Sequence, residues 1–458
     1  MSLEQALVIH CFVVAFAMAF AVLMLWRRRL LSILHSGTWV LFAFFLYFLF
    51  NPLLSLLNHD LSYYEDAMHA VAREGVSRIF WILGTIVAGL GAFLFYYVRK
   101  RKPVEGTVAA PPFSSTVDRW TPLQTVVLGI FILFAVYSVL FLRTKSQFVL
   151  STVTVEYDRG RIVGGATGYS VAAYGFLLYI VIILLYRGPS FARLLGLIVA
   201  TGNVALRLYD QHDRASIVSL LLAVAMVFIA RSGLRWQRLR MALVLVKKKN
   251  RIRTLAMLAA VACMAIFLAM RGHTSVAEVK EFNWEMGQQE LRQSDTAMLP
   301  TLYVWSFIYD KLEDYDYALP LASSILFGWL PRQYFPWKDD LPVFLLGRPD
   351  VRYNIHYAEW FLGPKATIIG SFYGHGGIIG VVLGMAILGV LTRRLDKLVA
   401  EGKTDLGRAI GIVWMAGIWM MFGSNDSWVV GEMFVCGLPF FGMWIAWKLS
   451  ANRYKRIT

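Results

Sequence analysis

Long apolar runs separated by short polar links make up most of this chain. A helix needs about twenty apolar residues to cross the hydrocarbon core of a bilayer, and eleven runs approach or reach that length. They fall at residues 6–26, 37–57, 77–98, 121–142, 168–186, 191–209, 214–231, 253–270, 366–391, 408–423 and 428–448. The pattern predicts an all-α polytopic membrane protein with about 11 transmembrane helices.

One polar segment is much longer than the other links. Residues 271–365 follow the eighth run and include the stretches WLPRQYFPWKDD and GRPDVRYNIHYAEWFLGPK. A long loop in a compact domain is usually functional or disordered, and dense Tyr and Trp argue against disorder. We therefore expect an N-terminal transmembrane region at 1–270, a large external loop with short helices at 271–365, and a C-terminal transmembrane region at 366–458.

Composition agrees with a membrane protein. Of the 458 residues, 58% are hydrophobic and only 16% are charged, and the mean hydropathy is +0.57. Soluble proteins carry roughly a quarter charged residues. The net charge of +16 does not indicate nucleic acid, because Lys and Arg collect in the cytoplasmic loops of membrane proteins.

Basic clusters predict the orientation. They lie on alternate links, at 27–29, 99–102, 187–193, 231–253, 393–397 and 448–456. Because positive charge marks the cytoplasmic side, these links are expected inside. The N-terminus is then outside, the C-terminus is cytoplasmic, and the 271–365 loop is external.

Charged residues crowd the junction between two spans at 207–216. Arg207 and Arg214 fall in the last and first turns of adjacent antiparallel helices, so both can point into one outward-facing pocket. Guanidinium groups match phosphate oxygens in pairs, and a helix N-terminus adds a positive dipole end. This is a candidate diphosphate clamp. The alternative is a pair of helix-end salt bridges with Asp210 and Asp213, which would imitate a site.

The external loop and the next span supply the other candidates. Arg332 lies among prolines and aromatic rings that either stack on sugars or mark the membrane interface. His356 and Glu359, three residues apart on one helical face, are alternative general bases, with Arg352 a turn away. An ordinary surface role is the alternative for His356. His375, among glycines that permit close helix packing, either faces a cavity or makes a helix contact.

No metal or cofactor is expected. The His, Cys and carboxylate residues have no metal-ligand spacing, and the chain has no glycine-rich nucleotide loop or nucleophile elbow. The outer side of a membrane also lacks nucleotide sugars. Glycosyl transfer there needs a donor that is activated before it crosses, such as a sugar on a polyprenyl diphosphate.

The chain resembles the Wzy-type oligosaccharide repeat unit polymerases, including the enterobacterial common antigen polymerases. The likeness covers nearly the whole architecture, with one long external loop before the last three helices. Arg214-Ala-Ser is similar to the family's Gly-Thr/Ser-Arg, and LFGWLPRQYFPWKDD to its I-P-x-W-L-W-P-x-R-P segment. Pro364 and the following IIGSFYGHGGIIG resemble its S-P-T-x-I-G-S…G-G stretch, and Arg352 with Gly363 fits an R-x10-G spacing. The chain departs at SNDSW, residues 424–428, where the common antigen polymerases have an Arg.

This resemblance implies a GT-C-like, O-antigen ligase-related architecture in a bacterial inner membrane. It implies a metal-independent glycosyltransferase, inverting or retaining, that moves a growing glycan from undecaprenyl diphosphate to the next lipid-linked repeat unit. Arg214 and Arg332 would bind the diphosphate with support from Arg207, and His356 or Glu359 would activate the acceptor hydroxyl. Arg352 and His375 would contact substrate.

Lipid-linked oligosaccharides, membrane lipid and a chain-length regulator are the expected partners, with no nucleic acid. The alternatives are an O-antigen ligase-like transferase with another acceptor, and a flippase or exporter of lipid-linked sugars. A flippase would need charged residues deep in several helices, and here the ionisable residues crowd the outer surface instead.

Overall fold

The computed structural model describes residues 1–28, 30–31, 35–71, 74–99, 122–133, 298–312, 367–401, 405–422 and 437–455, with single residues between 180 and 227 and between 315 and 326. In these ranges the regular structure is helical throughout and no residue is in a strand. Four of the described helical stretches are long and apolar enough to cross a membrane. The predicted class, a helical membrane protein, is confirmed to that extent.

The four stretches match predicted spans closely. They are α1 (Leu3–Arg27), the run Ser36–Leu57, α5 (Val76–Val98) and the apolar part of α18 (Thr367–Glu401). The second run contains α2 (Ser36–Phe44), a π-helical turn (Phe45–Phe50) and α3 (Asn51–Leu57). α18 runs ten residues beyond the predicted end at 391, because a helix need not stop where its apolar residues stop.

Three further helices fall in or near predicted spans. They are the short apolar helix Pro122–Leu133, α19 (Asp405–Phe422) and α21 (Leu438–Lys455). The span predicted at 428–448 begins before the described part of α21, which itself continues to Lys455. The spans predicted at 168–186, 191–209, 214–231 and 253–270 lie outside the described residues apart from isolated positions, as do the domain boundaries at 270 and 365.

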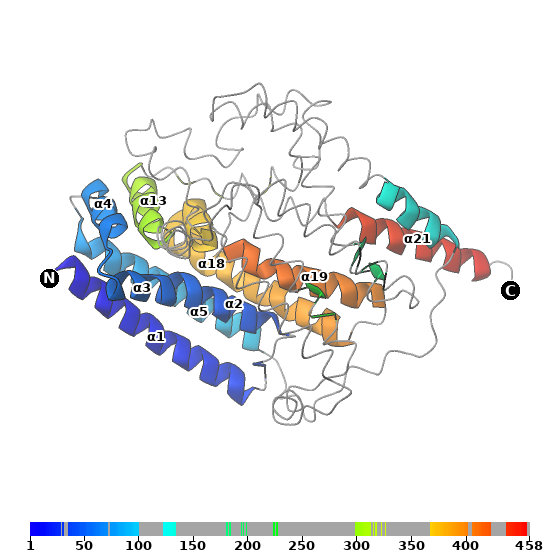
Figure 1. The fold of residues 1–458 in the computed structure, drawn as a ribbon, viewed down its shortest axis with the longest axis horizontal. Coiled ribbons are helices and arrows are strands. Elements are labelled where there is room, and N and C mark those ends of the chain that lie inside the picture. Colours follow the sequence, from blue (N-terminus) through cyan, green and yellow to red (C-terminus); the bar gives the residue numbers. More distant parts are fainter. Residues whose placement is uncertain are drawn as a thin grey trace, which may run out of the picture.

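α5 and α18 form the centre of the described bundle and pack more extensively than any other pair (Figure 1). Glycines bring their backbones together. A Cβ added to Gly389 would lie 2.6 Å from the Phe93 carbonyl oxygen, and one added to Gly89 would lie 2.9 Å from Val381. Small residues permit such contact between membrane helices. α1 packs on one side of this pair, and α19 packs against α18 and α2.

A proline explains the π-helical turn of the second span. Pro52 has no N–H to pair with the carbonyl four residues earlier, and its ring would clash with that carbonyl in a regular α-helix. The carbonyl belongs to Phe48, and its oxygen lies 3.1 Å from Nε2 of the buried His10 on α1. Because a carbonyl can only accept, Nε2 is the protonated ring nitrogen. His10 thus hydrogen-bonds to the carbonyl that would face Pro52 in a regular α-helix.

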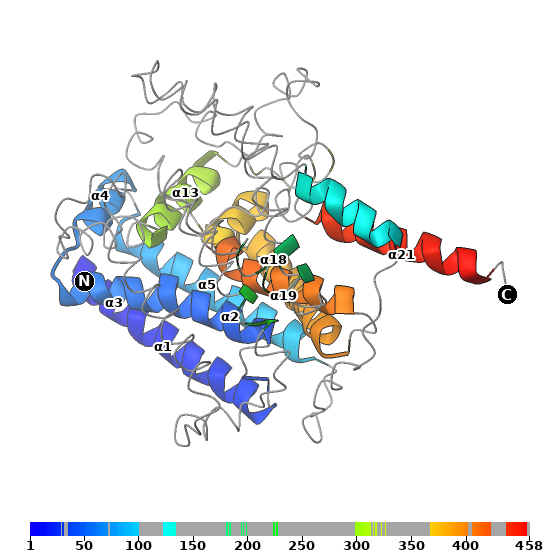
Figure 2. The same cartoon turned by 45° about the vertical axis from the view of Figure 1, so that its right-hand side comes forward.

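The two ends of the bundle differ in the helices and the charged links that lie there. α4 (Ser62–Ala70) and α13 (Met298–Leu312) lie together at the end where α5 and α18 begin (Figures 1 and 2). α13 belongs to the predicted external loop. At the other end basic links lie side by side, where Nη1 of Arg393 donates to the carbonyl oxygen of Arg99 at 2.7 Å.

A buried carboxylate ties three helices together at that second end. Asp396 of α18 accepts from the backbone N–H of Ser36 at 2.8 Å, from the Ser36 hydroxyl at 2.6 Å and from the Tyr97 hydroxyl. Ser36 begins α2, so the carboxylate also faces the positive end of a helix dipole. The Tyr97 hydroxyl in turn accepts from the Gly37 N–H at 3.2 Å. We call Ser36, Gly37, Tyr97 and Asp396 the Asp396 cluster.

α18 is broken near its beginning. Gly377 has φ 62° and ψ −144°, a conformation that is essentially reserved for glycine, and Gly376 is also non-helical. The segment Thr367–His375 folds back on the rest of the helix, since a Cβ added to Gly384 would lie 2.4 Å from the Phe372 ring. In a straight helix, positions twelve residues apart would be about 18 Å apart. Of the glycines predicted to permit close packing, Gly374 lies against the Tyr309 ring of α13 and Gly376 faces open space, and the break was not predicted.

Candidate functional site

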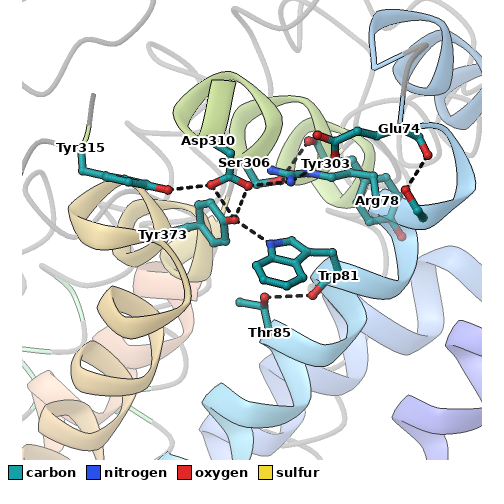
Figure 3. A network of polar contacts seen from close by, with 10 residues as sticks. Glu74, Arg78, Trp81, Thr85, Tyr303, Ser306, Asp310, Tyr315 and Tyr373 are labelled. Carbon is teal, nitrogen blue, oxygen red and sulfur yellow. Dashed lines mark hydrogen bonds and ion pairs between the residues drawn. The ribbon is translucent and has the colours of Figure 1, made fainter. Parts of the chain in front are cut away.

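Arg78 is the buried centre of a polar cluster at the end of the bundle where α5 begins (Figure 3). Its Nε donates to the Ser306 hydroxyl at 3.1 Å, and its Nη1 donates to Asp310 at 2.6 Å and to Glu74 at 3.3 Å. Burial of an unpaired guanidinium would cost several kcal/mol, so partners of this kind are needed. With Arg78 at its centre, the Arg78 cluster comprises Glu74, Arg78, Trp81, Ser306, Asp310, Tyr315 and Tyr373.

Asp310 connects α13 to both central helices. Besides the ion pair with Arg78 on α5, it accepts from the hydroxyl of Tyr373 on α18, at 2.9 Å and 2.7 Å from its two oxygens. The Tyr315 hydroxyl, just beyond the end of α13, donates to it at 2.7 Å. Hydrogen bonds to a charged acceptor are stronger than neutral ones. One carboxylate therefore fixes the end of α13 onto the beginnings of α5 and α18.

Trp81 and Tyr373 form the aromatic side of the cluster. The indole Nε1 can only donate, and it does so to the Tyr373 hydroxyl at 2.8 Å. That hydroxyl therefore accepts from Trp81 while it donates to Asp310, and its direction is set. Cζ of Arg78 lies 5.9 Å from the centre of the Tyr373 ring, within cation–π range. The indole is held in place although half of Trp81 is exposed.

Tyr309, near the end of α13, and Tyr315, just beyond it, lie against the break in α18. Their rings stack with centroids 6.2 Å apart. A Cβ added to Gly374 would lie 2.8 Å from the Tyr309 ring, and one added to Gly377 would lie 3.3 Å from the Tyr315 hydroxyl. Glycine at these positions leaves room for the rings, and at Gly377 it also permits the backbone conformation. The break and the docked end of α13 thus depend on each other.

The two carboxylate side chains that pair with Arg78 are more exposed than Arg78 itself. The side chain of Arg78 is 3% exposed, that of Asp310 26% and that of Glu74 39%. Among the described residues of the cluster, one guanidinium faces two carboxylates, so negative charge exceeds positive charge by one. Carboxylate oxygens accept and phenol and serine hydroxyls do both, which suits this surface to hydroxyl groups. Excess negative charge makes it unsuited to phosphate.

Two buried phenols lie behind the cluster. Tyr64 of α4 and Tyr303 of α13 have ring centroids 6.3 Å apart, and both are fully buried. Burial raises the pKa of each phenol well above its usual value, with a smaller contribution from Cys11 at Tyr64 and from Tyr64 at Tyr303. Both therefore stay neutral at physiological pH, and neither buried hydroxyl has a hydrogen-bond partner among the described residues.

Of the predicted site residues, His375 is the one within the described part of the chain. It is the last residue before the break in α18, is partly buried, and has its ring 6.2 Å from Phe372. It lies two residues from Tyr373, so it shares the segment that the Arg78 cluster holds. The predicted residues Arg207, Arg214, Arg332, Arg352, His356 and Glu359 lie outside the described residues.

Sequence reasoning did not single out the Arg78 cluster. One signal was present, since Arg78 lies in the first turn of a predicted span and ionisable residues there are functional by default. Its main partner, Asp310, is 232 positions away, and no local pattern links the two. Within the described residues no group of three or more His, Cys, Asp or Glu is arranged to hold a metal ion.

No protein-family model, curated protein or solved structure matches this chain.

Proposed function

We propose that the chain is a glycosyltransferase that polymerises undecaprenyl diphosphate-linked oligosaccharide repeat units on the outer face of the bacterial cytoplasmic membrane. One observation carries the proposal beyond sequence resemblance. Asp310 and Tyr373 are hydrogen-bonded, so the helices that precede and follow residues 313–366 are joined to each other on the bundle. Those residues contain four proposed site residues, Arg332, Arg352, His356 and Glu359.

A loop with both ends fixed on a rigid base is the usual setting for binding and catalysis. Here the base consists of α5, α13 and α18, joined by the Arg78 cluster. The base lies where membrane-spanning helices begin, which suits a substrate whose lipid is in the membrane and whose glycan is in water. A scaffold protein would have no need for so many arginines in such a loop.

The proposed orientation is supported by the distribution of charge. Arg99 and Arg393, from two different basic links, are in contact at the end of the bundle opposite the Arg78 cluster. Clustered positive charge marks the cytoplasmic side. The end with α4, α13 and the Arg78 cluster is then external, as a polymerase of exported lipid-linked sugars requires.

The proposed reaction needs no metal. An acceptor hydroxyl oxygen of the incoming unit bonds to the anomeric carbon of the growing glycan, while the bond from that carbon to the diphosphate oxygen breaks. His356 or Glu359 takes the hydroxyl proton. The undecaprenyl diphosphate leaves with added negative charge, which Arg214 and Arg332 stabilise with support from Arg207. Arg352 and His375 contact the glycan.

The test is glycan laddering by the purified full-length protein in nanodiscs, supplied with undecaprenyl diphosphate-linked repeat units and EDTA and without nucleotide sugar. Wild type should produce a ladder, Arg214→Ala should lose it, and His356→Ala should lose it if His356 is the base. Trp26→Ala, at the far end of α1, is a control that should leave the ladder unchanged.

Other outcomes identify other functions. Transfer to lipid A-core or another acceptor, without a ladder, would indicate a ligase. Movement of lipid-linked sugar across vesicles without any transfer would indicate a flippase. A ladder that EDTA abolishes would contradict the metal-independent mechanism.

A further inference from the structure

Arg78 has hydrogen-bonding capacity that the described protein does not use. Its Nε and Nη1 are occupied, but Nη2 is buried and has no hydrogen-bond partner among the described residues. A buried donor without an acceptor costs about 1–3 kcal/mol, so such groups in native proteins are normally paired with protein, water or ligand. Nη2 is therefore a donor that can take an oxygen acceptor once the partly exposed side chains of Glu74 and Asp310 move aside.

The groups around Arg78 are open to a ligand. Trp81 is 50% exposed although its Nε1 is fixed by Tyr373, so the indole offers an immobilised apolar face. Asp310 and Glu74 are partly exposed carboxylates that both pair with Nη1 of the guanidinium. Figure 3 shows them gathered along one edge where α5, α13 and α18 meet.

The charges of the Arg78 cluster indicate which class of ligand it can bind. The excess of one carboxylate repels an anion, and the carboxylates that would attract a cation are already paired with the Arg78 guanidinium at 2.6 and 3.3 Å. A neutral molecule with many hydroxyl groups avoids both costs, because it can donate to carboxylates and accept from Arg78. It also gains from contact with the Trp81 ring if it has a face of C–H groups. Carbohydrates combine these properties.

We propose that the Arg78 cluster is a saccharide-binding site, with Trp81 as the stacking platform and Glu74, Arg78 and Asp310 as the hydrogen-bonding groups. The proposal deepens the proposed function and rests on it, since the saccharide would be part of a lipid-linked repeat unit. In this proposal the Arg78 cluster binds the sugar, and the diphosphate is assigned to Arg207, Arg214 and Arg332.

The experiment uses the full-length protein in nanodiscs. Wild type is first applied to an array of unmodified soluble oligosaccharides, and the best-bound oligosaccharide is then titrated by calorimetry, with inorganic diphosphate as the anionic comparison. Trp81→Ala should weaken oligosaccharide binding about tenfold or more, and Glu74→Gln should weaken it by a smaller factor. Trp26→Ala is the matched control, since Trp26 is 59% exposed at the far end of α1.

Thermal unfolding of each variant separates loss of binding from loss of fold. If Trp81→Ala is unfolded, Trp81→Phe keeps a ring and Glu74→Gln keeps the shape, and both should still weaken binding. Three results would each overturn the proposal. Wild type binds no oligosaccharide, or Trp26→Ala loses as much binding as Trp81→Ala, or the folded Trp81 and Glu74 variants bind as well as wild type. Diphosphate binding that competes with the oligosaccharide would also overturn it.

The two proposals can fail separately. Trp81-dependent oligosaccharide binding by a protein that makes no ladder would contradict the polymerase and leave the saccharide site standing. If wild type makes a ladder and the Trp81→Ala variant binds and extends glycans equally well, the polymerase stands and the saccharide site is contradicted.

Discussion

The Arg78 and Asp396 clusters lie at opposite ends of the same two helices, and each pairs a buried ionisable group in a different way. Both place an ionisable residue of α5 or α18 out of water and connect it to a third helix. At Asp396, the backbone N–H and hydroxyl of Ser36 and the hydroxyl of Tyr97 all donate to the carboxylate, and Ser36 and Tyr97 are fully buried. At Arg78, the two carboxylate partners are 26% and 39% exposed, and Nη2 has no hydrogen-bond partner among the described residues.

The difference is the one expected between a structural contact and the binding surface that we propose. A polar group that only holds helices together is best surrounded by its own partners, because any unsatisfied group costs stability. A group that binds a ligand must keep capacity for it. The Asp396 cluster meets the first description and the Arg78 cluster the second, so substitutions should affect stability at one end and ligand binding at the other.

The largest effect is expected at Asp396. Asp396→Ala removes the acceptor for the Ser36 N–H and hydroxyl and for the Tyr97 hydroxyl, all buried, and should lower the free energy of unfolding by about 4 kcal/mol. Detergent-induced unfolding in mixed micelles measures it. Asp66→Ala is the matched control, because Asp66 is exposed and should change stability by less than about 0.5 kcal/mol. Equal effects of the two changes would remove the distinction between the clusters.

Arg78→Met should destabilise less, by about 2 kcal/mol, because water can reach Asp310 once the guanidinium is gone. The pair Arg78→Met and Asp310→Asn tests whether the two residues act as a unit. In a double-mutant cycle the combined change should cost clearly less than the sum of the single changes. Additive costs would mean that the short ion pair contributes little.

Gly377→Ala should cost about 2 kcal/mol, because alanine is strained at φ 62° and ψ −144°. The loss should be local to the Arg78 end. Hydrogen exchange should increase in α13 and in the segment 367–375 and stay unchanged around Asp396. Gly91→Ala is the control, since a Cβ there meets open space and should be neutral or slightly stabilising. Exchange that rises at both ends would show that the two clusters are coupled through α18.

Removal of one hydroxyl from each cluster gives a direct comparison. Tyr97→Phe takes a donor from Asp396 and an acceptor from the Gly37 N–H, and should cost about 1.5 kcal/mol. Tyr373→Phe should cost about 1 kcal/mol, because Asp310 keeps Arg78 and Tyr315 as donors. The same unfolding titration ranks them, and a larger loss for Tyr373→Phe would contradict the proposed order.

The smallest effect is expected at Glu74. Its ion pair with Arg78 is 3.3 Å long and its side chain is 39% exposed, so Glu74→Gln should change stability by less than about 0.5 kcal/mol. Added salt should reduce the difference further. A loss of several kcal/mol would make Glu74 a structural partner of Arg78 and weaken its assignment to saccharide binding.

Hydropathy was enough to predict the parts of the fold that depend on length and apolar content. The spans predicted at 37–57 and 77–98 agree with Ser36–Leu57 and Val76–Val98 to within a residue, since burial in lipid requires long apolar helices whatever their neighbours. The pattern could not reveal which helices meet. The Asp310–Arg78 pair, the fold-back of α18 at Gly377 and the His10–Phe48 contact depend on residues far apart or on one backbone conformation.

For the candidate site, too, local sequence patterns predicted some features and could not predict contacts between distant residues. A rule about charges in spans directed attention to Arg207 and Arg214, and it applies equally to Arg78, which was passed over. His375 was chosen for its glycine-rich surroundings, and it does lie in the segment that carries Tyr373. The roles of the residues in the long loop remain predictions.

The hydrogen bond between Asp310 and Tyr373 has a consequence for how this protein can change over time. With both ends of residues 313–366 fixed, the entropy of closing the loop depends only weakly on its length, and doubling a loop costs about 0.6 kcal/mol. Insertions and deletions between these anchors should therefore reduce folding stability far less than changes at the anchors themselves. Related chains can then differ in the length of this segment and keep the same joined helices on either side of it.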